Sequence, residues 1–190
     1  MKMRLIGSIS AAIVAMGTSL GLAQQAPTPP ANVFAIPSTG VSFITGDTWE
    51  QNGQRMRLYG VQSCIRGSLF TNAAGVRQDC GEASLAMLAA LVRDTHPTCS
   101  AVAKLPAYQG NPPVNLVICA AHIGANTPDL GTVMVVQGFG FAAFTNQGEP
   151  VYKPYSVAEE LAKKNKSGLW AYPDFIHPNA ILFKAVNPDK

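Results

Sequence analysis

The chain has few charged side chains, because Asp, Glu, Lys and Arg make up only 13% of its 190 residues. Its formal net charge is +3, and Lys2 and Arg4 supply two of these charges in a segment without acidic residues. Without that segment the charge falls to +1 (3 − 2). Proteins that bind nucleic acid through its phosphates usually carry a clustered basic face. The low, nearly balanced charge therefore counts against nucleic acid as a partner.

Metal-binding patterns of cysteine and histidine are also missing. There is no C-x-x-C pair, and the three histidines, His96, His122 and His177, are scattered. Zinc sites combine such residues at short, fixed spacings. The sequence therefore predicts no zinc site and no cofactor, apart from calcium under a nuclease alternative considered below.

Long apolar runs are absent except near the N-terminus, where Leu5–Leu22 follows two basic residues. Small residues precede Gln24 in the pattern of a cleavage site, so residues 1–23 are predicted to be a secretory signal peptide. A transmembrane anchor is the alternative, because the run approaches the ~20 apolar residues that span a bilayer. Small and polar residues within the run favour cleavage. We therefore expect a periplasmic or secreted protein with no membrane span after signal cleavage.

The exported part begins with a segment, 24–38, that is rich in Pro, Ala and Gln and lacks periodicity, which predicts an extended linker. The range 39–186 is long enough for one domain with a hydrophobic core. Export makes disulfides the expected state of its cysteines, although four cysteines permit three connectivities. These cysteines are Cys64, Cys80, Cys99 and Cys119.

Two segments give the clearest signals of secondary structure. Asn52-Gly53 separates the apolar-rich runs Val41–Trp49 and Gln54–Val61, which predicts a hairpin because both turn positions need positive φ. The range Gln78–Arg93 has apolar residues at helical spacing. Asp79 is its expected N-cap, with an acidic residue three positions later.

The rest of the chain alternates between predicted strands and helices. Strands are expected at Cys99–Lys104, Val114–His122 and Phe139–Phe144, and helices at Asp129–Gln137 and Val157–Ser167, the latter capped by Ser156. This order predicts an α+β, mainly β fold: a five-stranded OB-type barrel with about three helices. That arrangement favours pairing of Cys99 with Cys119 on neighbouring strands, and of Cys64 with Cys80 between a loop and the start of a helix.

Several short motifs follow one another in a recognisable order. They are Gly46-Asp47-Thr48-Trp49, Arg57-Leu58-Tyr59-Gly60-Val61, Cys80-Gly81-Glu82-Ala83, Asp129-Leu130-Gly131 and Gly168-Leu169-Trp170. Their order and spacing resemble the staphylococcal-nuclease-like (thermonuclease) family over about Gly40 to Leu182. The resemblance implies that family's OB-fold domain. In active members it also implies hydrolysis of phosphodiester bonds with one calcium ion.

Carried over position by position, the resemblance implies that most of the chemistry is gone. Asp47 stands at the first metal carboxylate and Arg57 at the first phosphate-binding arginine. Gln62 replaces the second metal aspartate, Ile65 replaces the glutamate that handles water, and Val114 replaces the second arginine. Each of the three missing groups commonly contributes ~2–4 kcal/mol of transition-state stabilisation. Calcium-dependent catalysis is therefore not expected.

The retained residues have simpler explanations beside the functional ones. Asp47 could cap the turn or keep a metal role, and Arg57 could pair with Asp47 or bind an anion. Arg66 and Arg77, in the loop before the first helix, could replace the missing phosphate contact. Glu82 could serve as a base, although capping of the helix explains its position.

We therefore expect an exported, disulfide-linked, catalytically inactive thermonuclease-like protein that acts as a binding or accessory module. Some members of this family in rhizobia are associated with biosynthesis of the acidic exopolysaccharide succinoglycan. The resemblance thus implies an acidic polysaccharide or envelope proteins as partners. The alternative is a weak secreted metal-dependent nuclease that uses Asp47 and Arg57 with calcium.

Overall fold

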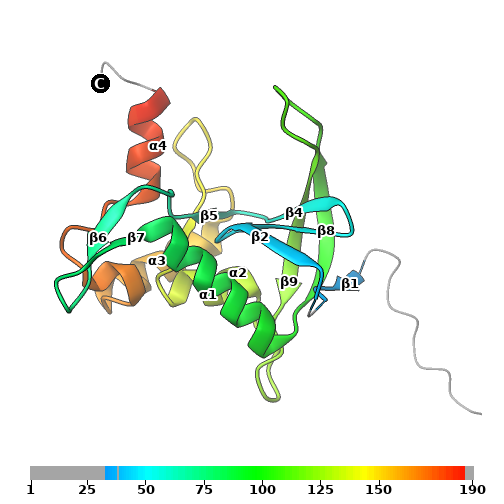
Figure 1. Cartoon of the computed structure of the whole chain (residues 1–190), viewed down its shortest axis with the longest axis horizontal. Helices are drawn as coiled ribbons and strands as arrows, with labels where there is room; N and C mark the ends of the chain where they lie inside the picture. Colours follow the sequence, from blue (N-terminus) through cyan, green and yellow to red (C-terminus); the bar gives the residue numbers. More distant parts are fainter. Residues whose placement is uncertain (1–32, 38, 187–190) are drawn as a thin grey trace, which may run out of the picture.

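The computed structural model describes residues 33–37 and 39–186, so the expected signal peptide lies outside the described residues. The fold is α+β, with a curled six-stranded sheet at its centre in the order β1-β8-β9-β4-β3-β2 (Figure 1). Neighbouring strands are antiparallel except for β4 and β9, which are parallel. The strands are β1 (Val33–Ala35), β2 (Val41–Thr45), β3 (Thr48–Gln51), β4 (Gln54–Leu58), β8 (Thr98–Leu105) and β9 (Val114–Ala120).

Two short ribbons and four α-helices complete the described part of the chain. The ribbons pair β5 (Val61–Ser63) with β10 (Gly140–Ala142), and β6 (Leu69–Thr71) with β7 (Arg77–Asp79). The helices are α1 (Cys80–Thr95), α2 (Leu130–Val136), α3 (Lys153–Lys164) and α4 (Pro178–Val186), with a 3-10 helix at Gly168–Ala171. A barrel-like α+β fold is thus confirmed, although the curled sheet has six strands where five were predicted.

The predicted hairpin is present, but its first arm consists of two strands. Asn52 and Gly53 have φ values of 51° and 71° and join β3 to β4 as expected. The range Val41–Trp49, predicted as one strand, turns at Gly46 between β2 and β3, so that prediction was wrong. A Cβ on Gly46 would lie 2.5 Å from the Cβ of Ser84 on α1. The chain turns where α1 comes too close for any side chain.

The ends of the helices follow local capping chemistry where the sequence offers it. The Asp79 side chain accepts a hydrogen bond from the Glu82 amide at 3.0 Å, so the predicted cap of α1 is confirmed. Asp129 likewise caps α2. The third helix begins at Lys153, not after Ser156, because Pro154 fits the first turn, where a missing N–H costs nothing.

Two features of the described chain were not predicted. Helix α4 is a fourth α-helix where about three were expected. Strand β1 falls inside the range 24–38, which we expected to be an extended linker. There, Val33–Ala35 pairs antiparallel with Thr98–Ser100 of β8.

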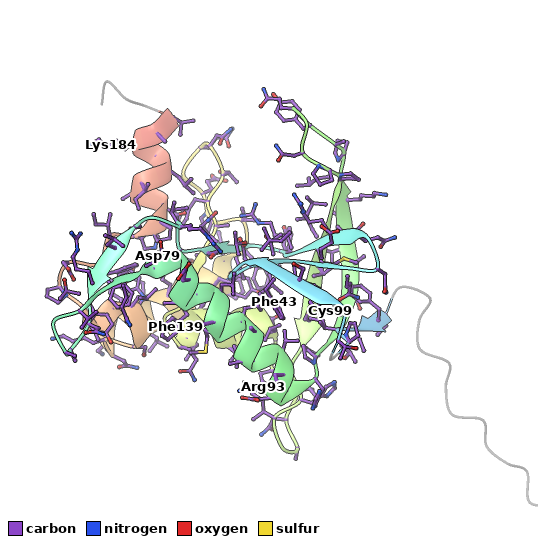
Figure 2. All side chains as sticks on the ribbon, in the orientation of Figure 1. Phe43, Asp79, Arg93, Cys99, Phe139 and Lys184 are labelled. Carbon is purple, nitrogen blue, oxygen red and sulfur yellow. A yellow bond between two sulfur atoms is a disulfide. The ribbon has the colours of Figure 1, made fainter. Side chains whose placement is uncertain are left out.

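The core lies between the inner face of the sheet and helices α1 and α2. Trp49, Leu88, Leu130 and Val117 are fully buried there. Phe43 and Phe139 are partly buried and pack against the same cluster (Figure 2). No helix between residues 33 and 186, with position 38 left aside, is long and apolar enough to cross a bilayer.

Both disulfides have the favoured pairing. Cys99 and Cys119 lie directly opposite each other on β8 and β9, with 3.9 Å between their Cα atoms. Cys64, just after β5, is bonded to Cys80 at the start of α1. Disulfides are typical of proteins that fold in oxidising compartments.

A buried polar contact fixes α3 against α2. The Tyr155 hydroxyl donates a hydrogen bond to the Asp129 carboxylate at 2.7 Å. Burial and this hydrogen bond together raise the pKa of Tyr155 far above its ordinary value, so its phenol stays neutral. A Cβ on Gly131 would lie 2.2 Å from the same hydroxyl, so this contact requires glycine.

Candidate functional site

The Asp47 carboxylate is buried in the turn between β2 and β3, with 2% of the residue exposed. Its Oδ1 atom accepts hydrogen bonds from the hydroxyls of Thr45 and Thr48. Its Oδ2 atom accepts from the Ser63 amide at 3.3 Å and from the Arg57 guanidinium. Both carboxylate oxygens are therefore engaged by donors from the protein itself.

Arg57, on β4, is the cationic partner of this carboxylate. Its Nε and Nη2 atoms lie 3.1 Å and 3.0 Å from Asp47 Oδ2. Nη2 also donates to Gln62 Oε1 at 3.2 Å. The side chain is 38% exposed, so the ion pair is buried at its carboxylate end and open to solvent at its guanidinium end.

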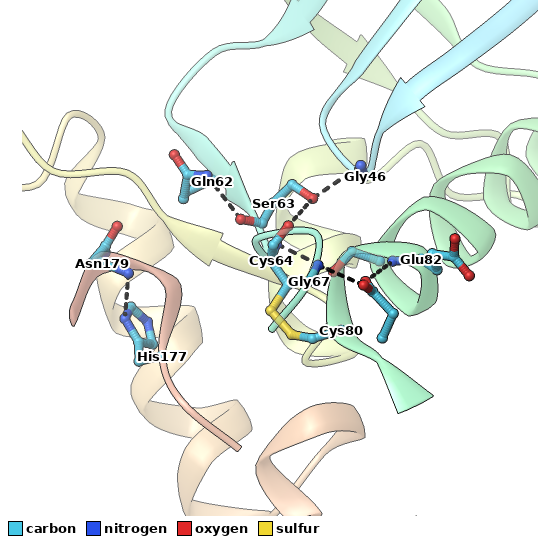
Figure 3. Close-up of a disulfide and its surroundings, with 11 residues drawn as sticks. Gly46, Gln62, Ser63, Cys64, Gly67, Cys80, Glu82, His177 and Asn179 are labelled. Carbon is cyan, nitrogen blue, oxygen red and sulfur yellow. Dashed lines mark hydrogen bonds between the residues drawn. A yellow bond between two sulfur atoms is a disulfide. The ribbon is translucent and has the colours of Figure 1, made fainter. Parts of the chain in front are cut away.

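Gln62 and Ser63 form the wall of the site on β5. The Gln62 amide donates to the Ser63 carbonyl at 2.8 Å, while its oxygen accepts from Arg57. The Ser63 hydroxyl accepts from the Gly46 amide at 3.0 Å and donates to the Cys64 carbonyl at 3.1 Å (Figure 3). These bonds join the turn that carries Asp47 to the segment that carries the Cys64 disulfide.

The other two substituted positions bring no charge to this site. Ile65 is partly buried after β5, and its carbonyl accepts from the Ser68 amide at 3.1 Å. Val114 is in register with Arg55 of β4, two positions along β9 from the partner of Arg57. The structure therefore places an aliphatic side chain on the strand next to Arg57, where the resemblance implies an arginine.

The groups considered as replacements lie elsewhere. The Arg66 guanidinium is 3.9 Å from the Glu82 carboxylate, and both side chains are more than half exposed. Arg77 is exposed on β7. None of these three residues is among the donors and acceptors that bind Asp47 or Gln62.

The donor set around Asp47 does not fit calcium. Calcium takes six to eight oxygen ligands, usually with several carboxylates. Here one carboxylate is available, a guanidinium nitrogen lies 3.0 Å from it, and the Gln62 oxygen already accepts from the same arginine. Within the part of the chain that the structure describes, no group of three or more His, Cys, Asp or Glu side chains could hold a metal ion.

A cleft of about 870 Å³ opens beside Gln62. One wall is the loop Phe144–Gly148, the opposite wall is α4, and α3 and the 3-10 helix form the base (Figure 1). The side chains that line it are Gln62, Phe144, Thr145, Asn146, Gln147, Glu159, Glu160, Lys163, Trp170, His177, Asn179, Leu182, Phe183 and Val186. The cleft therefore begins at a residue that also contacts Arg57.

A chain of hydrogen bonds holds α4 at the cleft. The Glu159 carboxylate accepts from the Ala142 amide of β10 and lies 2.8 Å from His177 Nε2. His177 Nδ1 accepts from the Asn179 amide at 3.2 Å (Figure 3), so Nε2 carries the ring proton and donates to Glu159. Asn179 also donates to the Ala142 carbonyl at 2.8 Å. His177 thus caps α4.

Sequence reasoning brought together Asp47, Arg57 and Gln62 correctly as neighbours, and it missed the cleft. His177 was treated as one of three scattered histidines. The one local signal was Pro178, a residue suited to the first turn of a helix, directly after His177. Its partners Glu159 and Ala142 lie on other elements and carry no sequence signal that connects them to it.

Comparison of the chain with models of known protein families and with curated protein sequences finds no match in either case.

Proposed function

We propose that this protein is an exported, catalytically inactive member of the thermonuclease-like group that serves as a binding or accessory module. One observation carries the proposal: the Asp47 carboxylate accepts hydrogen bonds from two hydroxyls, a backbone amide and Arg57. A carboxylate satisfied in this way supports the turn between β2 and β3. It has no free oxygen to offer a cation.

The same contacts reduce what Arg57 can do for a phosphate. Nucleases stabilise the developing negative charge with donors that are fixed and available. Two of the Arg57 nitrogens already bind Asp47 and Gln62, and Val114 supplies no second cation. The geometry therefore supports an ion pair with a structural role, left in place after catalysis was lost.

The architecture supports the proposed OB-type, thermonuclease-like assignment without requiring it. The sheet is curled, strands β2 to β4 form an antiparallel meander, and β8 and β9 follow after a helix. OB-type barrels bind oligonucleotides and oligosaccharides on comparable sheets. The low net charge favours the second class of ligand, and we propose an acidic exopolysaccharide such as succinoglycan as partner.

Nuclease assays test the loss of catalysis. Purified protein without residues 1–23 is incubated with single-stranded DNA and calcium, beside its Asp47→Ala variant. We expect background cleavage from both. Calcium-dependent cleavage that disappears in Asp47→Ala would refute the proposal and support the alternative, a weak secreted nuclease.

A restoration variant makes a negative result informative. Gln62→Asp, Ile65→Glu and Val114→Arg together return the three missing groups to the positions that the resemblance assigns. Cleavage by the triple variant and none by the wild type would show that the assay detects this chemistry and that the natural chain lacks it. Calcium-dependent cleavage by both proteins would contradict the proposal.

Thermal shift measurements with succinoglycan oligosaccharides test the binding function. A raised unfolding temperature at millimolar ligand is expected, because a ligand that binds the folded state stabilises it by mass action. No shift at that concentration would overturn the saccharide partner. A pull-down from envelope extracts would then test envelope proteins as partners.

A further inference from the structure

We infer that the cleft between the loop Phe144–Gly148 and α4 binds a sugar residue that carries a single carboxylate. This inference rests on the proposed binding function and adds the site and its recognition chemistry. The volume of about 870 Å³ lies within the range of small-molecule pockets, roughly 300–1,000 Å³. The lining combines apolar walls, uncharged polar groups and one cation.

The apolar part is fixed in place by the hydrogen bonds at the base of α4. Asn179 and His177 tie the first turn of α4 to β10 and α3, so the helix stands beside the loop and not against the core. Leu182 is 40% exposed on α4 and Phe144 is 42% exposed across the cleft. These exposed apolar surfaces face a space in which the C–H faces of a sugar ring would cover them.

The charged part of the lining favours one negative charge. Lys163 is exposed on α3, its Nζ lies 5.7 Å from the centre of the Trp170 ring, and no carboxylate among the described residues pairs with it. Glu160 is an exposed carboxylate on the same helix, and Glu159 is already bound to His177. A polyanion such as DNA would be repelled by these carboxylates. A single carboxylate can reach Lys163.

The loop supplies the groups that hydroxyls need. Thr145, Asn146 and Gln147 are exposed, uncharged side chains that donate and accept hydrogen bonds. A purely apolar ligand, such as an acyl chain, would bury these amides without partners, which is costly. A polyhydroxylated ring satisfies them while its apolar face covers Phe144.

Calorimetric titration with two matched ligands tests the inference: a short oligosaccharide that ends in glucuronic acid, and its carboxyl-reduced counterpart. We expect the wild type to prefer the carboxylated ligand by about tenfold, the scale of one charge-assisted hydrogen bond. Lys163→Met should abolish this preference. Phe144→Ala should weaken both ligands equally, and Lys164→Met, an exposed lysine of α3 outside the cleft, should change neither.

The outcomes separate the site from the function. Equal affinity of the wild type for both ligands, or an unchanged preference in Lys163→Met, would refute the cleft as the carboxylate site while saccharide binding stands. If the wild type binds neither ligand nor succinoglycan oligosaccharides, the saccharide function fails as well. Circular dichroism spectra and unfolding temperatures equal to those of the wild type exclude misfolding as the cause.

Discussion

Replacement of Asp47 by alanine is the sharpest test of how the buried carboxylate is used. The substitution removes the acceptor for four donors: two threonine hydroxyls, the Ser63 amide and the Arg57 guanidinium. The hydroxyls can rotate toward other acceptors. The Ser63 amide is fixed on a buried strand and cannot.

The expected loss of stability follows from these differences. An unsatisfied buried amide costs ~1–3 kcal/mol. Removal of one partner from a buried ion pair costs ~3–5 kcal/mol. Because Arg57 is 38% exposed and can be hydrated, the lower part of that range applies. We therefore expect a loss of about 3–4 kcal/mol in the free energy of unfolding, which corresponds to a decrease of ~10 °C in unfolding temperature.

The assay is thermal and urea denaturation without calcium and with millimolar calcium. Glu50→Ala is the matched control, because Glu50 lies on the neighbouring strand, is 44% exposed and pairs with Arg55 at 3.8 Å. Its loss is expected to cost less than ~1 kcal/mol. Calcium should change neither the wild type nor the variants.

A metal-ligand role predicts the opposite pattern. A carboxylate kept for calcium would be neutral or unfavourable in the empty site, so Asp47→Ala would leave stability unchanged or raise it. Calcium would then stabilise the wild type and not the variant. That combination of results would refute the structural role argued above.

Three further predictions concern packing, covalent links and a buried phenol. Gly46→Ala should lower the unfolding temperature by several degrees, because its Cβ would lie 2.5 Å from the Cβ of Ser84, and an unchanged temperature would contradict that packing. Replacement of both Cys99 and Cys119 by alanine should cost ~3 kcal/mol in urea denaturation, and an equal midpoint would argue against the link. Tyr155→Phe should cost ~1.5–3 kcal/mol at pH 8. Because the folded pKa of Tyr155 is raised, its stabilisation is complete below the unfolded value of ~10 and declines above it, so the gap to the variant should narrow between pH 9 and pH 11, and a constant gap would contradict this.

Local signals in the sequence were sufficient where the structure depends on neighbouring residues. The Asn52-Gly53 turn follows from backbone conformation alone, and the caps at Asp79 and Asp129 follow from one side chain and an amide three positions later. The pairing of Cys99 with Cys119 followed once two adjacent strands were predicted.

Features that depend on distant contacts could not be predicted in this way. The turn at Gly46 occurs because α1 approaches at Ser84, which a pattern of apolar residues does not reveal. Helix α4 is held by Glu159 and by the backbone of Ala142, residues far from it in sequence. The cleft combines side chains from β5, α3, α4 and a loop, so no single segment carries its pattern.

The positions of the two disulfides divide the molecule by how it can open. Cys80 is the first residue of α1, and Cys99 lies on the strand that follows this helix. Both ends of α1 are thus connected to covalently cross-linked segments, so its amide hydrogens should exchange with solvent through global unfolding. Helix α4 is attached by hydrogen bonds at its first turn and should exchange through local opening. Reduction of the disulfides removes this difference on the side of α1 and leaves the cleft wall unaffected.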